Sequence, residues 1–128
     1  MRVYGVCVAE FPRSLSGREA AVLHRLIQVQ PEPLRSVYET QARSARVGSV
    51  CGCGCPTINL IVNAAQAKRA GDDERWEIAH AESPLGPVIL VVSEGWLESL
   101  ELLYWSGDPA PTEFPDPSEM TPHLRSEP

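Results

Sequence analysis

The sequence predicts an α+β fold in which two N-terminal helices pack on a mainly antiparallel sheet of about four strands, followed by a Pro-rich C-terminal tail. Three observations lead to this prediction. Apolar side chains recur at helical spacing in residues 16–41, and short alternating or continuously apolar segments typical of strands fill residues 57–105. Half of the twelve prolines lie beyond residue 107. We therefore expect one domain over residues 1–107 and an extended or partly disordered tail over residues 108–128.

The first helix is predicted to begin at Ser16. Ser16 and Glu19 have the spacing of a capping box, in which each side chain accepts a backbone N–H from the other residue. One apolar stripe follows, formed by Val22, Leu23, Leu26 and Ile27. Pro31 and Pro33 end this helix, and Pro33 suits the first turn of a second one. The residues predicted to share a face of that second helix are Leu34, Val37, Tyr38 and Gln41.

Strands are predicted in the second half of the chain. Alternation of apolar and polar residues indicates a half-buried strand over Ile58–Val62 and another near Arg75–Ala81. The continuously apolar, β-branched run Val88–Val92 is typical of a central strand. The pattern of Trp96–Trp105 fits either a strand or a helical turn. Because only a hairpin-length connection separates it from Val88–Val92, we expect these two segments to pair.

Composition limits the function. Of the 128 residues 43% are hydrophobic, and the net charge is −6 with the basic residues dispersed, which disfavours binding to nucleic acid or to a membrane surface. The N-terminal apolar stretch is too short for a secretory signal, so we expect a cytoplasmic protein. Thiols stay reduced in that compartment, so the four cysteines are interpreted as free thiols or metal ligands rather than as disulfides.

The most unusual segment is Cys51-Gly52-Cys53-Gly54-Cys55-Pro56. In an extended strand its three thiols would point to one face, with neighbours roughly 6 to 7 Å apart along the backbone. Such a row cannot enclose one zinc ion, whose bonds to sulfur are about 2.3 Å long. Metal binding therefore requires the segment to bend, and the two glycines permit a bend because they tolerate positive φ.

A closed zinc site needs a fourth ligand, and the candidates are Cys7, His24, His80 and His123. We expect Cys7, because it lies on a predicted N-terminal strand that could run beside the segment. The candidate metal site is therefore Cys51, Cys53, Cys55 and Cys7. Thiolate ligands suit zinc and also Cu(I), so the sequence leaves the metal open.

Other interpretations of the segment stay open. The thiols could be small buried apolar groups, with the glycines allowing close backbone approach. They could instead perform redox or nucleophilic chemistry, although the C-x-x-C pair of dithiol oxidoreductases is absent. Alternating backbone conformations could also form an anion-binding nest. The sequence contains no P-loop, dinucleotide fingerprint, G-x-S-x-G elbow or H-E-x-x-H motif, so we predict no catalytic residues.

The segment 50–60, together with Gly95–Glu101 and the Phe114–Pro117 ending, resembles short uncharacterised bacterial proteins that carry a Cys-Gly segment. The later half also resembles small immunity proteins of bacterial toxin systems. That second resemblance implies a basic protein partner. The leading functional hypothesis is therefore a small non-enzymatic binding protein in which the cysteine segment is structural, and the second resemblance implies an immunity-like role for it. A thiolate metal-binding protein, with zinc or copper, is the alternative, and a thiol redox enzyme is the third.

Overall fold

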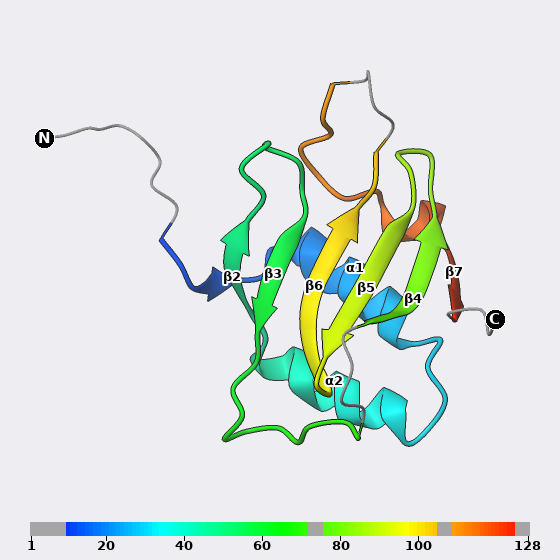
Figure 1. Cartoon of the computed structure of the whole chain (residues 1–128). Coiled ribbons are helices and arrows are strands. Elements are labelled where there is room, and N and C mark those ends of the chain that lie inside the picture. Colours follow the sequence, from blue (N-terminus) through cyan, green and yellow to red (C-terminus); the bar gives the residue numbers. More distant parts are fainter. Residues whose placement is uncertain (1–9, 72–75, 105–108, 125–128) are drawn as a thin grey trace, which may run out of the picture.

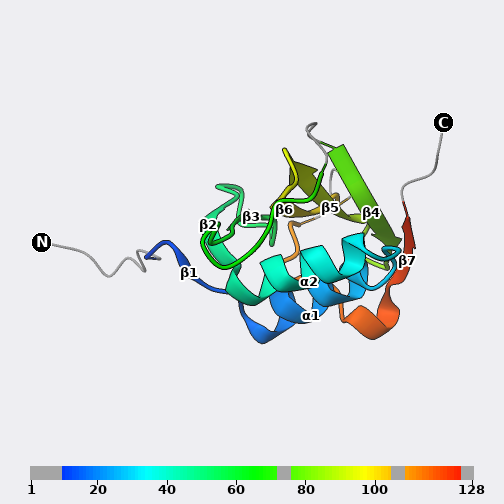
Figure 2. The same cartoon turned by 90° about the horizontal axis from the view of Figure 1, so that it is seen from below.

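A computed structural model describes residues 10–71, 76–104 and 109–124 of the chain. Its centre is one antiparallel sheet, and two helices lie side by side on one face of that sheet, as Figure 1 shows from the front and Figure 2 from below. None of the helices in the described ranges combines the length and the apolar character that crossing a bilayer requires. The hydrophobic core fills the space between the two layers.

The strands are β1 (Arg13–Ser14), β2 (Arg46–Val50), β3 (Ile58–Ile61), β4 (Trp76–Glu82), β5 (Val88–Ser93), β6 (Trp96–Leu102) and β7 (Thr121–Leu124). The helices are α1 (Gly17–Ile27) and α2 (Leu34–Ser44), and a short 3-10 helix, η1 (Pro117–Glu119), precedes β7. The strand order across the sheet is β1-β2-β3-β6-β5-β4-β7. The β2–β3 hairpin therefore lies near one edge of the sheet, whereas β4 and β7 form the other edge.

The predicted start of α1 is confirmed. The Glu19 N–H donates to Ser16 Oγ (3.1 Å), and the Ser16 N–H donates to Glu19 Oε1 (2.8 Å), which completes the capping box. Both guanidinium nitrogens Nη1 and Nη2 of Arg13 also donate to the Glu19 carboxylate, each at 2.9 Å. The predicted apolar stripe is at most 1% exposed, and it comprises Val22, Leu23, Leu26 and Ile27. The ion pair between Arg13 and Glu19 therefore ties β1 to α1, which covers the sheet.

The predicted hairpin between Val88–Val92 and the following segment is also confirmed, because β5 and β6 pair in antiparallel register up to Ser93 opposite Trp96. The two turn residues, Glu94 and Gly95, have φ values of 54° and 84°, which suit a tight hairpin turn. A Cβ on Gly95 would lie 2.1 Å from the carbonyl oxygen of Ala70, so this position requires glycine for space as well as for conformation.

The buried Gln41 connects α2 to this hairpin. Its side chain is fully buried, and Nε2 donates to the carbonyl oxygens of Lys68 (2.9 Å) and Gly95 (2.8 Å). Its Oε1 accepts the N–H of Leu97 at 2.9 Å. The buried amide is thus satisfied on both its donor and its acceptor side, as a polar group in a core must be to avoid a desolvation penalty.

The predicted architecture is wrong in its strand number, in the position of the helices and in the tail. The sheet has seven strands rather than about four. The helices do not form an N-terminal unit, because β1 precedes them and pairs with β2. The segment expected to be a Pro-rich tail contains η1 and β7, and β7 pairs with β4. The predicted domain boundary at residue 107 lies outside the described residues.

Each error has a physical reason. Two residues are too few for β1 to show alternation, and a register shift between Val47 and Ser49 interrupts the period of β2. Pro122 belongs to the edge strand β7, where a residue without an N–H is tolerated because one side of the strand has no partner. Phe114 and Met120 are only 1% and 3% exposed, so apolar anchors hold this proline-containing segment on the core.

Candidate metal centre

The three cysteines of the segment lie in the connection between β2 and β3. The Cys51 N–H donates to the Thr57 carbonyl at 3.2 Å, which extends the hairpin pairing beyond β2. The Gly54 N–H then donates to the Cys51 carbonyl at 3.3 Å and closes a four-residue turn. Gly54 has φ +90°, in the left-handed region that favours glycine. The segment is therefore a curled loop and not a continuous strand. We call residues 51–56 the cysteine loop.

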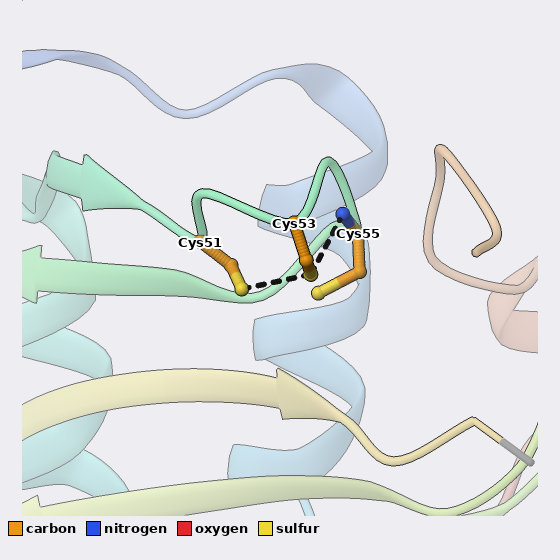
Figure 3. A group of neighbouring side chains, drawn as sticks. All are labelled: Cys51, Cys53 and Cys55. Carbon is orange, nitrogen blue, oxygen red and sulfur yellow. Dashed lines mark hydrogen bonds between the residues drawn. The ribbon is translucent and has the colours of Figure 1, made fainter. Parts of the chain in front are cut away.

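The curl brings the three sulfur atoms together, and Figure 3 shows the side chains converging on one side of the loop. The Sγ atoms of Cys51, Cys53 and Cys55 all lie within 4.8 Å of one another. Cys51 Sγ and Cys53 Sγ are 2.9 Å apart, and the Cys55 N–H donates to Cys53 Sγ at 3.4 Å. The bend that the sequence requires for metal binding is therefore present in the folded chain.

The three thiols differ in exposure and in acidity. Cys53 is exposed, Cys51 is partly exposed, and Cys55 is buried with 8% of its surface accessible. Hydrogen bonds from the Cys51 thiol, then from Cys55 and Tyr104, lower the pKa of Cys53 to about 7. The pKa of Cys51 is raised, mainly because hydrogen bonding to Cys53 favours its protonated form. Near neutral pH the pair therefore behaves as a Cys53 thiolate that accepts a hydrogen bond from the protonated Cys51 thiol.

Tyr104 belongs to this site, although the sequence analysis did not identify it. Its hydroxyl helps to lower the pKa of Cys53, and the nearby Cys53 charge raises the pKa of the phenol. The β3–β6 register explains the contact. Ile58 lies opposite Leu100, so the residue four places after Leu100 reaches the level of the residue four places before Ile58, within the cysteine loop. No local sequence signal predicts this register.

A surface cavity of about 280 Å³ borders the loop. Its lining includes Cys51, Cys55 and the side chains of Arg13 and Arg18 from the region around the start of α1. Arg13 is occupied by Glu19, while Arg18 Nη1 donates to the Phe114 carbonyl at 2.8 Å. Because the cavity borders the cysteine loop on this side, the loop backbone has room to adjust there.

The other predicted ligands are not at this site among the described residues. Cys7 lies outside them. His24 is exposed on α1, and His80 and His123 face each other across β4 and β7 with ring centroids 5.3 Å apart. Within the described ranges, the group that could hold a metal consists of Cys51, Cys53 and Cys55, without any histidine.

Two of the alternative interpretations fit the loop less well. Packing accounts for the buried Cys55, but it gives no reason for an exposed Cys53 beside a partly exposed Cys51. An anion-binding nest needs N–H groups that point at a ligand, whereas those of Gly54 and Cys55 are bonded to Cys51 O and Cys53 Sγ inside the loop. The feature that the loop brings together is a cluster of three sulfur atoms, which fits a metal site better than either alternative.

Comparison of the chain with protein-family models, with curated proteins and with solved structures finds no match in any of the three. The resemblance to short bacterial proteins and to toxin-immunity proteins therefore stays a prediction, as does a basic protein partner. A function can be inferred only from the cysteine loop itself.

Proposed function

We propose that the protein binds one thiophilic metal ion, of the zinc or Cu(I) class, through the thiolates of Cys51, Cys53 and Cys55. The observation that carries this proposal is the convergence of three sulfurs, all within 4.8 Å of one another, in a single short loop. Soft thiolate ligands select Cu(I) and zinc over the hard cations that prefer oxygen. The donor set therefore defines the class of metal, although not the metal itself.

The sulfur positions are close to those that one ion needs. Ligands at about 2.3 Å from a common metal are separated by about 3.8 Å in a tetrahedral site and about 4.0 Å in a trigonal one. Cys51 and Cys53, now 2.9 Å apart, would have to separate by roughly 1 Å. Gly52 and Gly54 have no atom within 4 Å of an added Cβ, so the loop has space for this movement.

Protonation also supports metal binding. Metal ligands must be thiolates, and Cys53, with a pKa of about 7, is substantially ionised at neutral pH before any metal arrives. The nearby Tyr104 hydroxyl would donate to the metal-bound Cys53 sulfur as an outer contact, and such contacts orient ligands and tune affinity. Binding should therefore release protons mainly from the other thiols, and affinity should fall as pH drops below 7.

The number of described ligands separates the two metals. Three sulfurs can complete a trigonal Cu(I) site, whereas zinc requires a fourth ligand, for which Cys7 is the sequence candidate. The core forms between helices and sheet without the loop, so the proposed role is reversible metal binding by a folded protein.

The test is a competition titration on protein purified anaerobically without a metal-binding tag. Zinc and Cu(I) are each titrated against a chromophoric chelator, with wild type, Cys7→Ser and the triple variant Cys51→Ser, Cys53→Ser, Cys55→Ser. We expect one tightly held ion per wild-type chain and none in the triple variant, which should still unfold cooperatively in its metal-free form. A loss of zinc affinity but not of Cu(I) affinity in Cys7→Ser would identify the fourth zinc ligand. Equal competition by wild type and the triple variant would contradict the proposal.

A further inference from the structure

We infer that Cys51 and Cys53 are also a site of reversible oxidation, at which a peroxide converts the two thiols into an intrachain disulfide. We further infer that this oxidation releases the bound metal. The second statement rests on the proposed metal binding, whereas the first concerns the loop alone.

Geometry selects this pair of sulfurs. The two Sγ atoms are 2.9 Å apart, and a disulfide bond is about 2.05 Å long, so bond formation needs a movement of less than about 1 Å. The intervening Gly52 meets no atom within 4 Å of an added Cβ, and Gly54 already supplies the sharp bend. The turn hydrogen bond between the Gly54 N–H and the Cys51 carbonyl keeps both thiols on the same side of the loop.

Exposure gives the two thiols different roles. Cys53 is exposed, so its sulfur is the one that a dissolved peroxide meets first. Its sulfur also accepts the Cys55 N–H at 3.4 Å, a contact that favours the attacking thiolate. Cys51 is the adjacent thiol that can resolve an oxidised Cys53, while the burial of Cys55 protects that third sulfur from direct attack.

The chemistry balances with hydrogen peroxide as the oxidant. The Cys53 thiolate attacks one peroxide oxygen, the O–O bond breaks, and a sulfenic acid and hydroxide form. The Cys51 thiol then attacks the Cys53 sulfur, the S–O bond breaks, and the disulfide and water are produced. In total two thiols lose two electrons and two protons, and one peroxide becomes two waters. A small thiol reductant reverses the change by thiol–disulfide exchange.

Metal release follows from the number of ligands. A disulfide between Cys51 and Cys53 removes two of the three thiolates that the loop offers, which leaves Cys55 alone. A single buried thiolate in the loop binds a metal ion much more weakly than three thiolates do. Oxidation should therefore empty the site, and reduction should restore it. The same loop would then bind metal only while its thiols are reduced.

The experiment uses the full chain with Cys7→Ser, so that three thiols remain. Metal-free protein is treated with a small excess of hydrogen peroxide, and free thiols and intact mass are measured before and after reduction. We expect the thiol count to fall from three to one, the mass to fall by two hydrogens, and peptide mapping to join Cys51 to Cys53. The variant with an added Cys55→Ser should still form the disulfide, whereas adding Cys51→Ser should abolish it with unchanged thermal unfolding. A disulfide to Cys55 instead, or oxidation only to sulfinic acid, would overturn the inference.

A second arm separates this inference from the proposed function. Wild-type protein, which keeps Cys7 as the candidate fourth zinc ligand, is loaded with zinc, oxidised, and assayed for free zinc with a chromophoric chelator, and peptide mapping identifies the disulfide that has formed. Release of one zinc per disulfide supports both. If the protein takes up no zinc when zinc is added but still forms the disulfide, metal binding and metal release are both refuted, whereas the disulfide inference stands. Metal binding without any disulfide in the metal-free protein would refute the oxidation.

Discussion

Replacing Gly54 with alanine should weaken metal binding, because it alters the turn without removing a ligand. Gly54 has φ +90°, and no atom lies within 4 Å of an added Cβ, so the penalty is conformational and not a clash. An L-residue in the left-handed region costs about 1–2 kcal/mol. The penalty falls on binding if the ligands hold the metal-bound loop at this φ while the metal-free loop relaxes out of it. The expected loss of affinity is therefore about 5- to 30-fold.

Gly52→Ala is the matched control. It adds the same methyl group two residues away, where space is equally open and the backbone does not adopt positive φ. Its affinity should equal that of wild type. Both variants are compared by zinc and Cu(I) competition titration, and metal-free thermal unfolding shows whether the penalty has moved into global stability. Wild-type affinity and wild-type stability in Gly54→Ala, or an equal loss in Gly52→Ala, would refute the argument that this turn organises the ligands.

Three further predictions concern the site and its support. Tyr104→Phe removes a hydroxyl that helps to lower the pKa of Cys53, so the thiolate absorbance of the metal-free protein should titrate above the pKa of about 7 for wild type; an unchanged midpoint would exclude that effect. Gln41→Leu leaves the buried Leu97 N–H without its partner and should lower the free energy of unfolding in urea by about 1–3 kcal/mol, with no change contradicting its bridging role. Burial raises the pKa of Glu19, but hydrogen bonds from Arg13 and Ser16 outweigh it and lower the pKa below 4.5. The stabilisation is then present above pH 4.5 and lost as the pH falls through the folded-state value, so wild type and Glu19→Gln should converge in acid; a constant difference would disprove the linkage.

Capping residues and short connections in the sequence correctly predicted where α1 begins and that β6 is a strand. The Ser16 and Glu19 spacing located the start of α1, and the hairpin-length connection before Trp96 correctly favoured strand over helix for β6. Strand number failed where no local signal exists. β1 has only two residues, and a proline within β7 indicates a tail unless the strand is known to lie at the sheet edge.

The cysteine loop shows the same division. The glycine spacing established that the segment could bend and that a metal site required it to bend. It could not give the direction of the bend, which depends on the Cys51 N–H pairing with Thr57 across the hairpin. Tyr104 was missed because it reaches the loop only through the β3–β6 register, which is set by pairing between residues far apart in the chain.

The most direct test of three-thiolate binding is X-ray absorption spectroscopy at the metal edge of wild-type protein loaded with one equivalent of zinc or Cu(I). The proposed site predicts a shell of at least three sulfur ligands at about 2.3 Å, reduced in the Cys53→Ser variant. A first shell composed of nitrogen and oxygen ligands only, the same in both proteins, would show that the ion is bound elsewhere and that the cysteine loop is not a metal site.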